Sequence, residues 1–384
     1  MLADYLQGTV PQLVERARLL KGKIPRGLPR DYEALIKTCH DELDNIIARL
    51  RELQAGAAAA SLAVRHAKLR QFKRAVADLD TVETRAIAAL HRVHDDDHHA
   101  NRLLYRICQE IAYPALPPTV STLSSGYFYI DPRLNLLFIP PAEGSFLLHL
   151  PDLYHELAHP LLAQKDHPVL DRLSQRFLEV TAEIHDYFAN QRAKETPRRG
   201  PQGFKDQIDI WEIVWTKWWL VEFFCDLYAV FTLGPAFAWS HFHLFMKMGK
   251  DPYEMPTPFR PATHPADDAR MRALLVALRA SGFDPEANTI AARWTDALTL
   301  ANAAPSPNYS FCYPEKLIGQ MVAKAREGVA EMGCRMAGHS TVEPIHLLLN
   351  EAWGRFWSDP SNYHQWEKAA VAQLRTLCNS DSPM

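Results

Sequence analysis

The five residues His155-Glu156-Leu157-Ala158-His159 are the part of the sequence best suited to chemistry. Residues four positions apart on a helix lie on the same face, so both imidazoles can bind one metal ion. Glu156, next to the first histidine, can reach a water molecule on that metal. Zinc suits neutral imidazole ligands, and three protein ligands leave a fourth position for water, whose pKa then falls to about 7. The pattern therefore predicts one catalytic Zn²⁺ per chain. The alternative is a surface helix that carries two histidines by chance.

Two carboxylates interrupt the most apolar part of the chain. Glu222 and Asp226 lie four residues apart inside the run WWLVEFFCDLYAVF. Carboxylates are costly to bury unless a cation or a metal ion pairs with them. We therefore interpret Glu222 as the third metal ligand and Asp226 as the acceptor for the free N–H of a ligating histidine. The alternative is that arginine or lysine side chains pair with both carboxylates.

Glu179 and Glu183 are rival candidates for the third ligand. They also lie four residues apart, and they follow His159 more closely in the chain than Glu222 does. Their segment, DRLSQRFLEVTAEIHDYF, is more polar, so exposure to solvent explains both carboxylates without a metal ion. We therefore prefer Glu222.

The segment THPADDAR (residues 263–270) adds a third polar element. His264 lies in a loop bracketed by prolines, from which it could face the site as a hydrogen-bond donor to the transition state. Arg270, six residues later, could pair with a buried carboxylate. Taken alone, a His-Pro pair in a loop is more often only a loop.

Together, the patterns HExxH, ExxxD and THPxxxxR resemble those of the gluzincin zinc metallopeptidases, particularly the branch of the CAAX prenyl proteases and the HtpX-like proteases. The resemblance covers residues 125–275, less than half of the chain. The matching positions are His155, Glu156, His159, Glu222, Asp226, His264 and Arg270.

This resemblance implies roles for the matching residues. Glu156 would act as general base and then carry the proton to the leaving amine, and His264 would stabilise the oxyanion. Residues 134–140 would form the edge strand along which an extended substrate lies. The chain departs from the family at Cys225, where a small residue is common, and in lacking the membrane-spanning segments of that branch. Its longest uncharged apolar run, residues 227–239, is too short for a bilayer, which needs about 20 residues.

The composition predicts a mainly α fold with a small β-sheet. Glycine is scarce (16 of 384 residues) and proline is plentiful (27), which favours helices separated by proline-containing loops. The run GYFYIDPRLNLLFIPP predicts a β-hairpin with Asp131-Pro132 at its turn. Long helices are expected over 146–162, where Pro160 could end the helix early, and over 169–194.

The chain divides, on this interpretation, into a zincin-like metallopeptidase core flanked by helical regions. The N-terminal helical region covers residues 1–112, the gluzincin-like core 113–275, and the C-terminal helical region 276–384. The alanine-rich run 55–60 lets one helix of the first region pack closely. The loop 196–203 is expected to be exposed and cleavable.

The sequence therefore predicts a soluble, cytoplasmic zinc metallopeptidase with narrow specificity for a protein or peptide substrate. Net charge is −3, so the chain as a whole does not favour nucleic acid, and its six cysteines form no CxxC pair. The alternative is an inactive or latent zinc-binding scaffold whose helical arms bind partners. A fourth protein ligand, such as His264 or Cys225, would favour that alternative because structural zinc sites are closed. A zinc hydrolase that acts on a non-peptide bond is a further possibility.

Other polar segments carry weaker signals. The segment HRVHDDDHH (91–99) could hold a second metal ion, but a solvated turn explains it more simply. His241 and His243 lie two residues apart, so a helix cannot direct both toward one site. Basic runs at 16–30 and 65–74 are interpreted as solvated helix faces.

Overall fold

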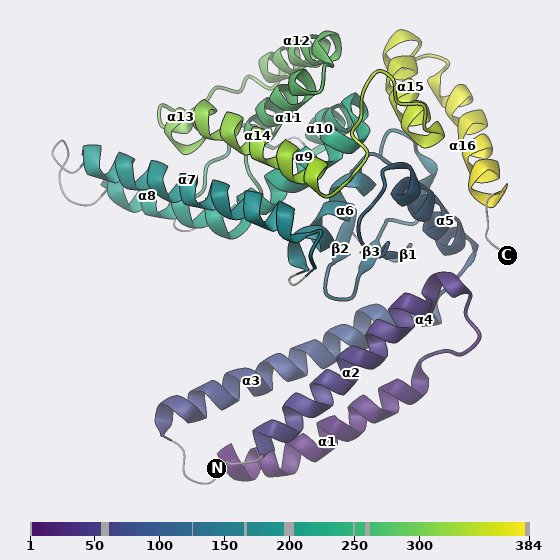
Figure 1. The fold of residues 1–384 in the computed structure, drawn as a ribbon, viewed down its shortest axis with the longest axis vertical. Helices are drawn as coiled ribbons and strands as arrows, with labels where there is room; N and C mark the ends of the chain where they lie inside the picture. The colour runs from purple at the N-terminus through teal and green to yellow at the C-terminus, as the bar shows by residue number, and fades with distance from the viewer. Residues whose placement is uncertain are drawn as a thin grey trace. The chain divides into compact units, whose positions relative to one another are not determined.

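The computed structural model describes residues 2–54, 61–124, 126–164, 167–195, 203–248, 250–257 and 262–380. The alanine-rich run 55–60 and residues 196–202 of the predicted exposed loop lie outside these ranges. The chain forms two compact units (Figure 1). The first contains residues 1–102 and 118–141, and the second contains residues 103–117 and 142–384.

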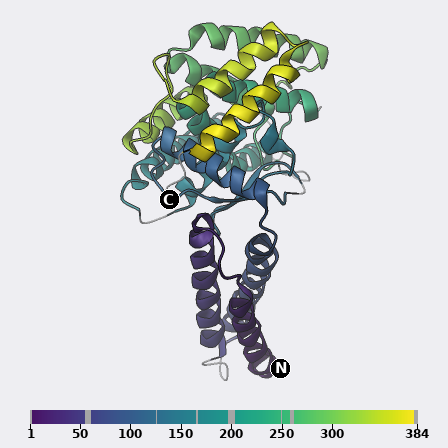
Figure 2. The same cartoon turned by 90° about the vertical axis from the view of Figure 1, so that its right-hand side faces the viewer.

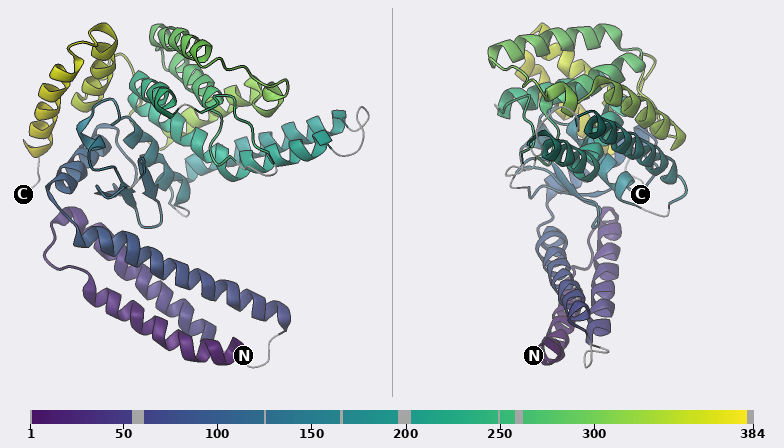
Figure 3. Two further views of the ribbon diagram at one scale, coloured as in Figure 1. Left: turned by 180° about the vertical axis from the view of Figure 1, so that it is seen from behind. Right: turned by 90° about the vertical axis from the view of Figure 1, so that its left-hand side faces the viewer.

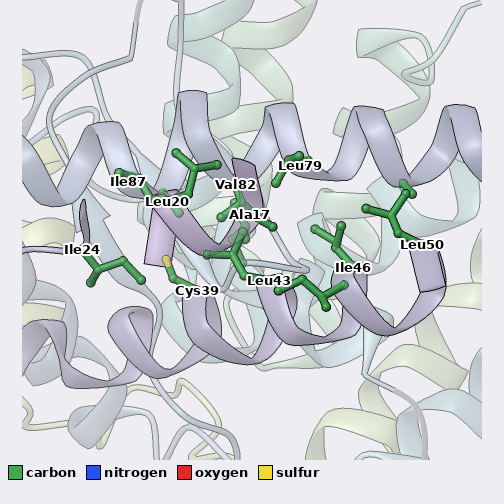
Figure 4. Close-up of a cluster of buried hydrophobic side chains, with 14 of the residues drawn as sticks. Ala17, Leu20, Ile24, Cys39, Leu43, Ile46, Leu50, Leu79, Val82 and Ile87 are labelled. Atoms are coloured by element: carbon green, nitrogen blue, oxygen red, sulfur yellow. The ribbon is translucent and has the colours of Figure 1, made fainter. Parts of the chain in front are cut away.

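The first unit contains a helical bundle. Its elements are α1 (Leu2–Lys23), η1 (Arg30–Tyr32), α2 (Glu33–Gln54), α3 (Leu62–Thr81), the π-helical segment η2 (Val82–Ile87), α4 (Ala88–His91) and the start of α5 (Asp95–Glu110). Apolar residues recur every three or four positions, so each long helix buries one apolar stripe against its neighbours. Figure 4 shows Leu20 of α1, Leu43 and Ile46 of α2, and Leu79 of α3 in this shared core.

The strands of the first unit form one small sheet with the order β1-β3-β2. β1 (Thr119–Ser121) pairs in parallel with β3 (Leu136–Phe138), and β2 (Tyr129–Asp131) pairs antiparallel with β3. β2 and β3 form the hairpin expected from the sequence. Oδ1 of Asp131 accepts hydrogen bonds from the N–H groups of Arg133 and Leu134, which closes the turn.

Asp97 holds α5 to the strand segment within the first unit. Its Oδ1 accepts hydrogen bonds from the backbone N–H and the hydroxyl of Thr122, at 2.6 and 2.9 Å, and its Oδ2 accepts one from the N–H of His94 at 3.0 Å. The residue is only 2% exposed. The expectation of a solvated turn is therefore wrong at Asp97. This carboxylate is buried because it accepts hydrogen bonds from the backbone N–H groups of His94 and Thr122.

The second unit is almost entirely helical. After the end of α5 and a short 3-10 turn η3 (Glu143–Ser145), it contains α6 (Asp152–Ala163), α7 (Asp171–Glu195), α8 (Gly203–Val214), the π-helical segment η4 (Trp215–Trp219), α9 (Leu220–Leu233), α10 (Pro235–Met248), α11 (Asp267–Ala280), α12 (Asp284–Leu300), α13 (Tyr309–Cys312), α14 (Glu315–Glu331), α15 (Pro344–Ser358) and α16 (Tyr363–Ser380). Figure 2 shows α15 and α16 side by side, and Figure 3 shows the same for α7 and α8.

Helix α9 lies at the centre of the second unit, packed against α6, α10, α11 and α14 (Figure 1). All of its residues from Phe223 to Leu233 are buried. Gly234 ends the helix with φ of 82°, a conformation that favours glycine, and Pro235 then begins α10. A side chain at Gly234 would also meet the Phe283 ring at 3.2 Å. This sharp turn fixes where α10 starts relative to α9.

Helix α6 continues through Pro160 to Ala163, so the proline does not end it early. A proline has no N–H, so the carbonyl four residues before it, that of Glu156, loses its helical donor. The next carbonyl, that of Leu157, accepts a hydrogen bond from the Tyr113 hydroxyl at 2.9 Å. A side chain from outside α6 thus donates a hydrogen bond to the helix next to the carbonyl that Pro160 leaves without a donor.

The expected class, mainly α with a small sheet, is confirmed. The two compact units do not coincide with the ranges 1–112, 113–275 and 276–384, because the strands belong with the N-terminal helices. The division into compact units does not show which residues carry a function. The metallopeptidase core at 113–275 and the edge-strand role of residues 134–140 therefore stay predictions. Within the described ranges, no helix has the length and apolar character required to cross a membrane.

Candidate metal centre

Helix α6 carries His155, Glu156 and His159 into the interior of the second unit. His155 and Glu156 are each 8% exposed, and His159 is half-buried. The two imidazole rings meet edge to face, with their centroids 5.1 Å apart. Phe237 of α10 stacks beside the His155 ring at 6.2 Å. The four-residue spacing therefore places both imidazoles together, as the sequence predicts.

Helix α9 presents Glu222, Cys225 and Asp226 on the face toward α6, because positions i, i+3 and i+4 share one side of a helix. Oδ1 of Asp226 lies 2.8 Å from Nδ1 of His155. Burial opposes a charge on His155, but Asp226 and Glu222 raise its pKa to about 10, so a metal ion at Nε2 would replace a hydrogen there. A carboxylate can only accept, so Nδ1 carries a hydrogen and Nε2 is the nitrogen left to face a metal ion. That is the arrangement expected of a carboxylate that orients a metal-binding histidine.

Arg270 of α11 holds the other side of the Asp226 carboxylate. Its Nε donates to Oδ2 at 2.7 Å and its Nη2 donates to Oδ1 at 2.6 Å. Asp226 is completely buried. Burial would raise the pKa of Asp226, but Arg270 and then His155 hold that pKa well below its usual range. The predicted pairing of Arg270 with a buried carboxylate is thus present in the structure.

Glu222 lies against the free nitrogen of His155. Its Oε2 is 3.4 Å from Nε2 of His155 and 3.5 Å from Nε2 of His264. This oxygen is shielded from water and accepts no hydrogen bond from the residues that the structure describes. Two ligands bound at about 2.0–2.2 Å to a tetrahedral zinc ion lie about 3.3–3.6 Å apart. The buried oxygen and the imidazole nitrogen therefore fit two positions around one metal ion.

Cys225 also approaches the two histidines. One nitrogen of His155, one nitrogen of His159 and Sγ of Cys225 all lie within 4.8 Å of one another, so this group could hold a metal ion. Cys225 is fully buried, and burial raises the pKa of its thiol well above the usual value. Burial also lowers the pKa of His159 to about 4, which keeps that imidazole in the neutral, metal-binding form near pH 7.

His264 lies at the more open side of the group. Its side chain is 62% exposed, and Nδ1 lies 3.0 Å from the hydroxyl of Thr263. The structure thus brings together His155, His159, Glu222, Asp226, His264 and Arg270. Glu156 is buried on α6 next to His155.

The rival ligands Glu179 and Glu183 do not join this group. Glu179 is partly exposed and pairs with Arg176 and with Lys324, each at 2.9 Å. Glu183 has a buried Oε2, but it makes no hydrogen bond or ion pair within the described part of the chain. Ion pairs at the surface account for Glu179 without a metal ion.

No known family model, curated protein or solved structure matches this chain. The geometry of this group of side chains is therefore the main guide to its chemistry.

Proposed function

We propose that the chain is a zinc-dependent metallopeptidase of the gluzincin type, with a zincin-like site formed by α6, α9 and the residues around α11. The observation that carries this proposal is the 3.4 Å separation between Oε2 of Glu222 and Nε2 of His155. The Glu222 oxygen is buried and has no hydrogen bond within the described ranges, so a cation between these atoms would satisfy it. His155, His159 and Glu222 are then the three ligands of one Zn²⁺.

The remaining residues divide the work of peptide hydrolysis. When bound, zinc lowers the pKa of water to about 7. Glu156, next to His155, accepts a proton from the attacking water and delivers it to the leaving amine. His264 donates a hydrogen bond from Nε2 to the developing oxyanion. Asp226 fixes the ring of His155, and Arg270 balances the charge of Asp226.

The substrate is a protein or peptide, and we propose a narrow specificity because more than half of the chain lies outside the residues 125–275 that carry the resemblance. Indiscriminate digestion of unfolded casein would contradict narrow specificity. All six cysteines are free and buried, which agrees with the reducing cytoplasm expected from the sequence.

A latent zinc-binding scaffold is the second candidate, and Cys225 is the observation that favours it. If its thiolate joined His155, His159 and Glu222, four protein ligands would close the site, as in structural zinc centres. A glutamate between the histidine ligands has no use in such a centre. Glu156 therefore favours the peptidase.

Metal content measured by mass spectrometry tests the ligand set. We expect about one zinc ion per chain in the wild type and its loss in Glu222→Ala. Glu179→Ala is the matched control, because Glu179 was the rival ligand and pairs only at the surface. Zinc retained in Glu222→Ala but lost in Glu179→Ala would move the third ligand and contradict the proposal.

Hydrolysis of a peptide library, followed by mass spectrometry, tests the reaction. Glu156→Gln should keep its zinc, because Glu156 is not a ligand, and should lose at least about 100-fold in rate. Cleavage at the wild-type rate by zinc-loaded Glu156→Gln protein would refute the role of Glu156. Zinc-loaded wild-type protein that cleaves no peptide would favour the latent scaffold.

A further inference from the structure

A second pair of imidazoles meets elsewhere in the second unit. His149 lies between η3 and α6, and His243 lies on α10. Their Nε2 atoms are 3.2 Å apart, and the ring centroids are 5.2 Å apart with 30° between the ring planes. Neither residue belongs to the zinc site described above, so the pair needs its own explanation.

Glu143 fixes the position of the hydrogen on His149. Its carboxylate contacts Nδ1 of His149. Because a carboxylate only accepts, His149 carries its hydrogen on Nδ1 and directs the lone pair of Nε2 toward His243. The same relationship joins Asp226 to His155. A carboxylate behind an imidazole is the usual support of a metal-binding histidine.

We propose that His149 and His243 bind a second divalent transition-metal ion through their Nε2 atoms, with Glu143 orienting His149. Two nitrogens at about 2.0–2.1 Å from a tetrahedral metal ion lie about 3.3–3.4 Å apart, close to the 3.2 Å observed. Imidazole ligands suit zinc, copper and nickel, and water molecules complete the coordination. The site is independent of the proposed peptidase function.

The surroundings hold the two rings in place. Phe146 packs on His149 with centroids 5.7 Å apart, and Trp353 meets the His243 ring edge to face at 5.8 Å. Burial, assisted by the charges of Lys247 and His243, lowers the pKa of His149 to about 4. Burial and Lys247 also lower the pKa of His243. Protons therefore do not compete with a metal ion for these nitrogens at neutral pH.

A direct hydrogen bond between the rings is the competing explanation. It requires that Nε2 of His243 carry a hydrogen and donate it to Nε2 of His149. The 3.2 Å separation also fits such a bond. The two arrangements differ in the number of metal ions that the full chain binds.

Equilibrium dialysis of the full chain against Zn²⁺, with metal counted by mass spectrometry, separates them. We expect two zinc ions per chain in the wild type and one in His149→Ala and in His243→Ala. His155→Ala should lose the ion of the proposed peptidase site and keep the ion at His149 and His243. Failure of the peptidase site can therefore be told apart from failure of the second site. His185→Ala is the matched control, because His185 contacts the Glu212 carboxylate but no second imidazole. Equal metal content in wild type and His243→Ala would overturn the second site.

Copper provides a readout that does not depend on the variants folding. One equivalent of Cu²⁺ added to wild-type protein that carries a single equivalent of zinc, enough for the His155 site alone, should give an electron paramagnetic resonance spectrum with hyperfine coupling to two imidazole nitrogens. A spectrum of free copper, or of copper bound by a single nitrogen, would show that the rings are joined only by a hydrogen bond.

Discussion

The carboxylate of Asp226 lies 2.8 Å from Nδ1 of His155, and this contact decides which nitrogen of the imidazole faces Glu222. Nδ1 is occupied as a donor, so only Nε2 is free to bind a metal ion. Arg270 holds the same carboxylate through two hydrogen bonds. The orientation of a proposed ligand on α6 therefore depends on charges contributed by α9 and α11.

Asp226→Asn should weaken zinc binding without removing a ligand. The amide cannot supply the carboxylate's charge to His155, and loss of such a partner typically costs 10- to 100-fold in metal affinity. Competition with a chelator of known affinity measures the change. Asp268→Asn is the control, because Asp268 is also a buried carboxylate and is held by Arg272. Asp268 contacts neither of the two proposed histidine ligands, His155 and His159. Unchanged zinc affinity in Asp226→Asn would mean that Asp226 does not orient the ligand.

Arg270→Met should destabilise the fold. The substitution leaves the fully buried Asp226 carboxylate without its main cationic partner, and breaking a buried ion pair from one side costs about 3–5 kcal/mol. Urea denaturation of chelator-treated protein measures the free energy of unfolding. Arg355→Met is the control. It breaks the ion pair between Arg355 and Glu351, two side chains that are each about half exposed, and should cost about 1 kcal/mol or less. Equal losses in the two variants would contradict this account.

The meeting of the candidate ligands was predictable because these residues obey local rules. The spacing of His155 and His159, and of Glu222 and Asp226, selects one face of a helix, whatever the rest of the chain does. The need to compensate a buried carboxylate then pointed to Arg270. The hairpin at Asp131 was predictable for a similar reason, since its turn chemistry is local.

Other features depend on long-range contacts that sequence patterns do not encode. His149 and His243 are 94 residues apart and lie in no motif, so nothing in the sequence pairs them. Asp97 lies in an acidic segment that the sequence suggests is solvated. In the structure it is buried and accepts hydrogen bonds from Thr122, which is distant in the sequence. The grouping of the strands with the N-terminal helices is likewise a property of tertiary packing.

His241 should make the fold sensitive to acid. Burial, followed by the charge of Arg270, lowers the pKa of His241, although Asp267 and Asp226 oppose this. The unfolded chain therefore takes up a proton at higher pH than the folded chain does, so stability falls as pH decreases below about 6.5.

His241→Gln tests this dependence. The amide can still donate to the carbonyl of Asp267, which Nε2 of His241 contacts at 3.1 Å, but it does not titrate. Urea denaturation at pH 7.5 and at pH 5.5, about one unit either side of the ordinary histidine pKa, should show a smaller loss of stability in the variant than in the wild type. The same loss in both proteins would exclude His241 as a source of the acid sensitivity.

Cobalt substitution distinguishes the peptidase from the latent scaffold at Cys225. Burial holds the pKa of this thiol well above its ordinary value, and the nearby carboxylates of Glu222 and Asp226 raise it further. In the proposed peptidase, His155, His159 and Glu222 hold the metal ion, and its fourth position belongs to water and not to this thiol. We therefore expect the Co²⁺-loaded wild type to show visible bands of tetrahedral cobalt without an intense near-ultraviolet band from thiolate-to-cobalt charge transfer, and Cys225→Ala to show the same spectrum and metal content. A charge-transfer band that disappears in Cys225→Ala would place sulfur on the metal. The site would then be closed by four protein ligands, and the scaffold would be the better account of this chain.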